Sequence, residues 1–299
     1  MRIHVNGTEL YVDIDGSQLR LEEGRLVERP TILVLHGGPG FDQGYLRPGL
    51  GLLRDDAQLV FVDLRGQGRS GRPPVETCTL EQMADDVAAL IDRIGLTDPI
   101  VFGHSAGGFV ALHLALRHPG HVRALILCDT APTLVPLPDD TPPPTLAERS
   151  SPEAVAIAGR LFSGDFSDET REAFGRLVAP YYAGPRQTHV PGQILQMSGF
   201  ARDVADHFFS VLATEYDLRP RLKEISAPTL VAVGSYDWVC PPVASRALAA
   251  GIYGASLVEF PEAGHFAFSE VPDAFQEAVR TFLRDTLELD AGPGEVAVV

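Results

Sequence analysis

Residues 103–107, with the sequence Gly-His-Ser-Ala-Gly, constrain the fold of this chain more than any other stretch. A short apolar segment (99–102) precedes them, and apolar residues at helical spacing follow over 108–116. This pattern predicts a strand, a sharp turn at Ser105 and a helix. Glycine is needed on both sides of the turn because the serine backbone is strained and the helix packs closely on the strand.

A turn of this kind exposes the hydroxyl of Ser105 at the C-terminal edge of a sheet. The N–H of the next residue, Ala106, then points at a carbonyl oxygen bound there. The alternative is an ordinary turn rich in glycine and serine, and the rest of the chain has to decide between the two. A second glycine-rich loop (36–40) follows an apolar run. We expect the N–H of Gly38, with Gly37 next in order, to be the second donor to that oxygen.

Apolar runs alternate with helical patterns along most of the chain, which predicts an α/β fold with a mostly parallel central sheet and helices on both faces. The predicted strands are 31–35, 58–62, 99–102, 122–127, 228–234 and 255–260, and further predicted helices are 79–94, 242–250 and 273–287. Alternating residues in 3–5 and 10–14 predict an opening β-hairpin. The tail from Asp290 is expected to fray.

The composition changes from about Pro132, where several prolines interrupt regular structure. Helical patches rich in aromatic residues follow as far as about Pro220. We interpret residues 132–220 as a helical cap inserted into a core formed by 1–131 and 221–299. A chain of 299 residues, 45% of them hydrophobic, is large enough for one α/β domain with such an insertion.

Three candidate catalytic residues, Ser105, Asp237 and His265, follow predicted strands, and ligands bind at the C-terminal ends of strands in a parallel sheet. A serine hydroxyl is a weak nucleophile and needs a neutral imidazole to take its proton. The imidazole in turn needs an anionic partner that fixes its tautomer. Asp129 also ends a predicted strand and is the rival acid, but we favour Asp237.

Other polar residues near these strand ends are expected to be structural. His104 precedes the turn and should point away from it, because side chains alternate along a strand. His36 should brace its own loop. Asp63 and Arg65 follow the strand 58–62, and we expect them to brace that loop through a charge-assisted hydrogen bond.

The formal net charge of −16 argues against binding to nucleic acid or to an anionic membrane, since both would repel the protein. No apolar run reaches the roughly 18 residues of a membrane span, and the N-terminus is too polar for a signal peptide. We therefore expect a cytoplasmic protein. The three cysteines show no metal-like spacing and predict neither a disulfide framework nor a zinc site. We expect no metal, no organic cofactor, and a small molecule or short peptide as substrate.

Several motifs together resemble the α/β-hydrolase superfamily. They are the loop 36–40 (His-Gly-Gly-Pro-Gly), residues 63–70 (Asp-Leu-Arg-Gly-Gln-Gly-Arg-Ser), 103–108, 236–237 and 264–266. The resemblance spans about residues 30–285 apart from the cap, and the chain order of serine, aspartate and histidine matches the superfamily. It implies an α/β-hydrolase fold with Ser105, Asp237 and His265 as a triad. The loop 36–40 is most typical of the proline iminopeptidase branch.

This resemblance implies a serine hydrolase that forms an acyl-serine and cleaves a small amide or ester, in the manner of a proline iminopeptidase. Relatives of that kind hold the substrate amino group with acidic side chains, and Glu215 and Asp217 at the end of the cap are the candidates. A carboxylesterase or lactonase is the alternative, because Ala106 stands where iminopeptidases usually have Trp and because Trp238 suits an uncharged, aromatic pocket. A non-catalytic binding protein with the same fold is a third hypothesis.

Overall fold

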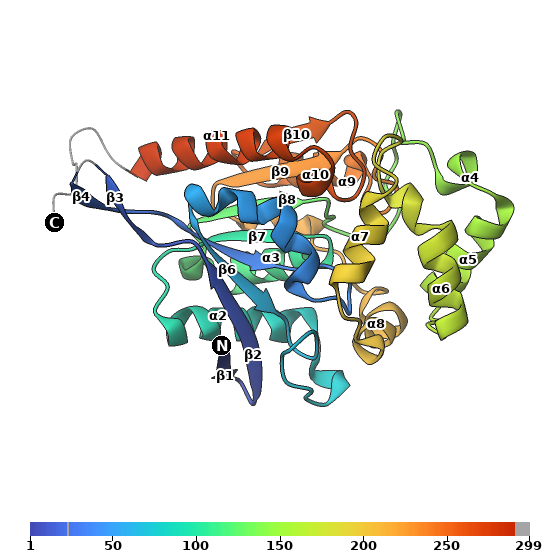
Figure 1. Ribbon diagram of the computed structural model, residues 1–299, viewed down its shortest axis with the longest axis horizontal. Coiled ribbons are helices and arrows are strands. Elements are labelled where there is room, and N and C mark those ends of the chain that lie inside the picture. The colour runs from blue at the N-terminus through green and yellow to red at the C-terminus, as the bar shows by residue number, and fades with distance from the viewer. Residues whose placement is uncertain (23, 291–299) are drawn as a thin grey trace.

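The computed structural model describes residues 1–22 and 24–290, so the tail beyond residue 290 lies outside the described residues. Its centre is an eight-stranded sheet with the order β1-β2-β6-β5-β7-β8-β9-β10 (Figure 1). The strands are β1 (Arg2–Val5), β2 (Thr8–Asp15), β5 (Thr31–Leu35), β6 (Gln58–Asp63), β7 (Ile100–His104), β8 (Ala124–Cys128), β9 (Thr229–Gly234) and β10 (Ser256–Phe260). β1, β2 and β6 pair antiparallel, whereas all pairs from β6 to β10 are parallel. The predicted mostly parallel α/β sheet is confirmed.

Each face of the sheet has its own hydrophobic core, because side chains alternate along every strand. Val60 and Val62 of β6 pack on the face that carries buried residues of α2 (Leu80–Ile94), α3 (Ala106–Arg117) and α9 (Pro242–Gly251). Phe61 packs on the opposite face, against α1 (Arg47–Leu50) and α11 (Pro272–Asp290). Helices therefore cover both faces, and the C-terminal ends of the parallel strands are left for a site.

Between β8 and β9 the chain forms helices that gather at one end of the molecule, on the right in Figure 1. They are α4 (Leu146–Arg149), α5 (Pro152–Phe162), α6 (Asp168–Leu177), α7 (Val190–Met197) and α8 (Arg202–His207), followed by a π-helical turn at Phe208–Leu212. Of these, α4, α5 and α6 enclose a small core of their own, which includes Leu146, Ile157 and, directly after α6, Val178. An isolated β-bridge between Thr133 and Asp217 joins the two ends of this insertion. We call residues 132–220 the cap segment.

A second hairpin and a short helix near His265 were not predicted from the sequence. A second hairpin, β3 (Leu19–Glu22) and β4 (Arg25–Glu28), extends from the sheet (Figure 1) and exposes Leu21 and Leu26. Residues 19–21 and 25–28 of this hairpin are all exposed, so no buried face among them imposes an alternating pattern. A short helix, α10 (Ala267–Glu270), begins two residues after His265 and is too short for helical periodicity to reveal it. This helix matters for the site, because Glu270 reaches back to the loop that carries the histidine.

Candidate active site

Ser105 occupies a sharp turn between β7 and α3, with φ 51° and ψ −124°. The backbone around it allows no side chain at the flanking glycines. A Cβ at Gly103 would lie 2.6 Å from the carbonyl oxygen of Gly107, and one at Gly107 would lie 2.3 Å from that of Leu35. Glycine at both positions therefore lets the helix approach the neighbouring strands, as the sequence predicted.

Asp237 and His265 meet at the C-terminal ends of β9 and β10. Oδ2 of Asp237 lies 2.8 Å from Nδ1 of His265, and both side chains are buried. The other oxygen of Asp237 accepts hydrogen bonds from the N–H groups of Val239 (2.8 Å) and Cys240 (3.0 Å), which fixes the carboxylate. Burial lowers the pKa of His265, but the charge and hydrogen bond of Asp237, together with the charges of Asp129 and Glu270, outweigh burial, so the pKa is raised. With Nδ1 facing the acid, Nε2 is the ring nitrogen left for proton transfer.

Asp129, the rival acid, has a different set of partners. Its two oxygens accept hydrogen bonds from the N–H groups of Gly234 (2.9 Å) and Ala267 (3.2 Å), and the thiol of Cys128 lies 3.2 Å away. Burial, followed by the charge of Asp237, raises the pKa of Asp129 to about 7. The carboxylate of Asp129 is thus engaged with the backbone at the end of β9 and at the start of α10, whereas the carboxylate of Asp237 contacts the imidazole of His265.

Hydrogen bonds of the side chains of His36 and Tyr45 hold the loop 36–40 in place. Nε2 of His36 accepts a hydrogen bond from the N–H of Leu64 at 3.0 Å. The N–H of Gly37 donates to the hydroxyl of Tyr45 at 2.7 Å. Of the two expected oxyanion donors, Gly37 is therefore already engaged, and Gly38 lines the cavity described below.

His104 is the centre of a buried polar chain. Its Nδ1 lies 2.7 Å from the hydroxyl of Tyr45, and its Nε2 lies 2.8 Å from the carbonyl oxygen of His265. Because the Tyr45 hydroxyl accepts from Gly37, it has its own proton free to donate to Nδ1. Nε2–H then donates to the carbonyl. Burial lowers the pKa of His104 well below its ordinary value, which keeps the ring neutral. The histidine has structural partners, as expected, yet it also contributes to the cavity wall.

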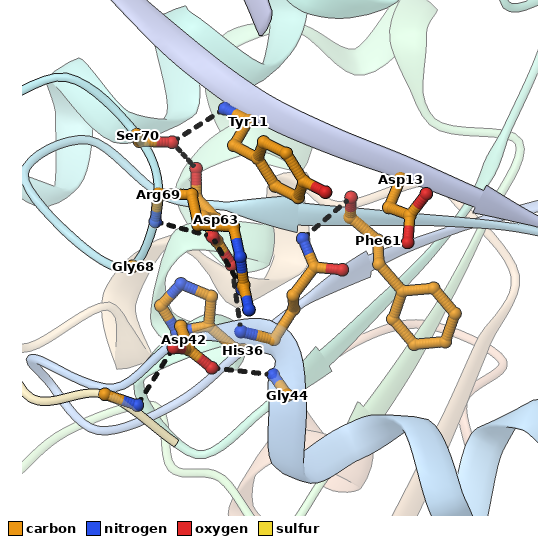
Figure 2. Close-up of polar contacts among 12 residues, drawn as sticks. Tyr11, Asp13, His36, Asp42, Gly44, Phe61, Asp63, Gly68, Arg69 and Ser70 are labelled. Atoms are coloured by element: carbon orange, nitrogen blue, oxygen red, sulfur yellow. Dashed lines mark hydrogen bonds and ion pairs between the residues drawn. The ribbon is translucent and has the colours of Figure 1, made fainter. Parts of the chain in front are cut away.

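Asp63 and Arg65 have separate partners rather than each other. The carboxylate of Asp63 accepts hydrogen bonds from the N–H groups of Gln43 (3.0 Å) and Arg69 (2.8 Å). These bonds tie the loop after β6 to the segment between β5 and α1 (Figure 2). The guanidinium of Arg65 makes two bonds, of 2.6 and 2.8 Å, to the carboxylate of Asp86 on α2. Both residues brace the loop, but each does so through bonds to other residues and not through a bond between the two.

A cavity of about 700 Å³ opens above these strand ends. Ser105, Ala106, Gly38 and His265 contribute to its lining from the core. Aromatic side chains are the largest group in the remaining lining: Phe41, Tyr45, Phe109, Phe162, Phe166, Phe174, Tyr182, Phe200, Phe208, Phe209, Trp238 and Phe266. Trp238 lies in this wall and donates its indole N–H to the carbonyl oxygen of Tyr181 at 2.9 Å. The core and the cap segment thus line one largely apolar cavity, to which Ser105 and His265 contribute.

The acids expected to bind a substrate amine lie elsewhere. Glu215 is exposed and Asp217 forms an ion pair with Arg219, and neither lines the cavity. The expectation rested on closeness in sequence to the returning sheet, but the bridge at Asp217 fixes this end of the cap segment outside the cavity. The acids that do line it are Asp168 and Glu172 of α6, both exposed. No motif marked these residues, because only the folded cap brings α6 to the cavity.

Two absences concern residues 1–22 and 24–290, the part of the chain that the structure describes. In this part of the chain, no group of three or more His, Cys, Asp or Glu side chains is arranged to hold a metal ion. Within the same residues, no helix has both the length and the apolar character to cross a bilayer. Cys78, Cys128 and Cys240 are buried free thiols.

Comparison with known proteins adds the family. The model of the alpha/beta hydrolase fold family matches residues 30–272. The chain is 28% identical to the proline iminopeptidase PfmaB of Pestalotiopsis fici, covering 91% of this chain and 98% of the relative. It is also 28% identical to a putative carbamate hydrolase, RutD, of a Caulobacter species, covering 90% and 96%.

Among solved structures, the chain is similar to the enol-lactonase from Burkholderia xenovorans LB400. The TM-score is 0.73 at 28% identity, and the match covers 95% of this chain and all of the other. A second structure, Est816, is described as an N-acyl homoserine lactone degrading enzyme and matches with a TM-score of 0.70 at 26% identity. It covers 94% of this chain and all of that chain. The chain therefore belongs to the alpha/beta hydrolase fold family and is a hydrolase.

Proposed function

We propose that this hydrolase works through an acyl-serine intermediate, with Ser105 as nucleophile, His265 as base and Asp237 as the acid that orients the imidazole. The hydroxyl oxygen of Ser105 attacks the carbonyl carbon of the substrate while Nε2 of His265 takes its proton. The leaving group then departs with that proton. Water attacks the acyl-serine in the same way, which releases the carboxylic acid and restores the serine.

For the negatively charged oxygen of the intermediates we propose the N–H groups of Ala106 and Gly38 as donors. Ala106 is the first residue of α3, so the positive end of the helix dipole strengthens its N–H. Gly38 adopts φ 133°, a backbone conformation that favours glycine. Its neighbour Gly37 is engaged with Tyr45, which supports the choice of Gly38.

For the substrate we propose a small carboxylic ester or lactone with an apolar acyl group, selected by the cap segment over a core of 1–131 and 221–299. The aromatic lining of the cavity carries this proposal. Each fully buried apolar side chain of a ligand gains about 1.5–3 kcal/mol in such surroundings, whereas an unpaired ammonium is penalised. The similarity to an enol-lactonase agrees with this class.

An aminopeptidase is the second candidate, favoured by Asp168 and Glu172 in the cavity lining and by the similarity to PfmaB. An aminopeptidase needs a carboxylate that remains paired with the substrate ammonium after water is excluded. Asp168 is fully exposed and already lies 3.6 Å from Arg171, so its charge is screened by solvent and by a neighbour. We therefore place the ester and lactone class first.

The decisive experiment combines a mechanism probe with a substrate panel. A fluorophosphonate should label the wild type and the Ser198→Ala variant, which removes another serine of the cavity lining. It should not label Ser105→Ala, whose kcat should fall on the order of 10⁶-fold. Labelling of Ser105→Ala would refute the serine mechanism.

The panel compares p-nitrophenyl butyrate and a γ-lactone with prolyl p-nitroanilide and its N-acetylated form. We expect turnover of the first two substrates only. Cleavage of the free-amine anilide together with rejection of the acetylated one would establish the aminopeptidase instead.

A further inference from the structure

Glu270 is a buried carboxylate that accepts hydrogen bonds from three backbone N–H groups. Oε2 accepts from Gly184 at 2.7 Å and from Gly264 at 2.9 Å, and Oε1 accepts from Phe266 at 3.0 Å. The side chain is only 3% exposed. Three donors converge on one carboxylate, and only an acceptor on both oxygens satisfies all of them. Burial raises the pKa of Glu270, and the three hydrogen bonds oppose that rise.

Two of these donors flank His265 on either side, and the backbone of the histidine itself is held as well. The N–H of His265 donates to the carbonyl oxygen of Tyr182 at 2.7 Å, and its carbonyl oxygen lies 2.8 Å from Nε2 of His104. The N–H groups of residues 264, 265 and 266 are therefore all engaged. With the backbone fixed in this way, the imidazole keeps its bond to Asp237.

The third donor, Gly184, belongs to the cap segment. The carbonyl groups of the same stretch accept from Arg149, at 3.0 Å for Tyr181 and 2.7 Å for Ala183. Arg149 also stacks on Tyr236, next to the acid of the site. The stretch 181–184 is thus bonded to the loop of the acid and to the loop of the histidine. Glu270 is one link to the second loop, beside the direct hydrogen bond from the N–H of His265 to the carbonyl oxygen of Tyr182.

We propose that Glu270 is a positioning residue. Its carboxylate holds the loop of His265 in place and binds the cap stretch 181–184 to that loop. The proposal rests on the proposed function, in which His265 is the base. Glu270 is absent from the cavity lining, so it acts through the histidine and not on the substrate. Its charge also lies close enough to raise the pKa of His265, which gives the role a spectroscopic signature.

The test uses two substitutions and a matched control. Glu270→Gln places an amide nitrogen against N–H donors, so at least one of the three bonds is lost along with the charge. We expect kcat to fall about 10²-fold with little change in KM, as a small misplacement of a catalytic group does. The pKa of His265, followed by NMR of ¹⁵N-histidine-labelled enzyme, should fall. Glu270→Asp keeps the charge but withdraws it from the amides, so kcat should fall while the pKa of His265 stays nearer to that of the wild type.

The control is Asp86→Asn, which removes the buried carboxylate of α2 that bonds to Arg65. It should lower Tm but leave kcat and the pKa of His265 unchanged. The inference is overturned if kcat is unchanged in Glu270→Gln. It is also overturned if Asp86→Asn has the same Tm as Glu270→Gln and loses kcat to the same extent. If Glu270→Gln does not fold, an unchanged kcat in Glu270→Asp overturns it equally.

Ser105→Ala is assayed beside these variants so that the two proposals fail separately. Full activity of Ser105→Ala would remove the serine mechanism. The NMR titration of His265 needs no turnover, so the effect of Glu270 on the histidine is measured whether or not that mechanism holds.

Discussion

The core and the cap segment contribute different groups to the same cavity. Besides the rings of Phe41, Phe109, Trp238 and Phe266, the core supplies polar groups whose partners are fixed: Asp237 on His265, Tyr45 on His104, and backbone amides on Asp129. From the cap come mainly apolar rings and exposed charges. We call the polar core groups at the strand ends the floor of the cavity, and the cap residues that line it the wall. A buried polar group keeps its position only when its hydrogen bonds are satisfied, whereas the aromatic residues of the wall require only packing.

This difference assigns separate tasks to the two regions. The floor can hold charges that develop during a reaction, because its dipoles are already oriented. The cap wall offers area and shape, which discriminate between substrates by a few kcal/mol at most for each group. Substitutions in the floor should therefore affect kcat, and substitutions in the wall should affect mainly KM and substrate preference.

The largest effect should come from the acid of the floor. Asp237→Asn should lower kcat about 10⁴-fold, because the imidazole loses the charge that fixes its tautomer. Asp129→Asn should cost far less, since that carboxylate bonds to backbone amides. Steady-state kinetics with p-nitrophenyl butyrate checks both, with circular dichroism to verify folding. The reverse ranking would make Asp129 the acid.

The next largest effect should be on the pH dependence of activity, which His265 in the floor controls. His265 must be neutral to accept the proton of Ser105, so activity is lost as the pH falls through its pKa. Because that pKa is raised above its ordinary value, the loss should begin at a pH above 6.5 when the pH is lowered. Below the pKa, kcat/KM should drop about tenfold for each further pH unit. A pH–rate profile measures this. An acidic limb well below pH 6.5 would contradict the role given to Asp237.

The smallest effect should come from the wall. Phe209→Ala removes a ring of the cavity lining, and KM for a hexanoate ester should rise about tenfold while KM for the acetate changes little. Val211→Ala, in the same π-helical turn but exposed to solvent, is the matched control and should change neither. Michaelis constants for the ester series test this. A fall in kcat for the acetate would show that wall and floor are not separable.

Much of the floor could be predicted because its residues follow strands. An unbroken apolar run marks a strand buried on both faces, and parallel strands bring their C-terminal ends to one edge. Ser105, Asp237 and His265 could therefore be placed together without knowing any distance. The glycines around Ser105 could also be interpreted locally, because a close approach between helix and strand excludes side chains within the motif itself.

What the sequence determined by itself is the fold, the sheet edge and the residue types gathered there, because periodicity and chain order are local properties. Only the tertiary structure decided which acid pairs with His265, that Gly37 is engaged by Tyr45, and that α6 rather than Glu215 or Asp217 reaches the cavity. Glu270 belongs to this second group, since its three donors come from two separate stretches of chain. Such pairings depend on the positions of segments far apart in sequence, and packing of the whole chain sets those positions.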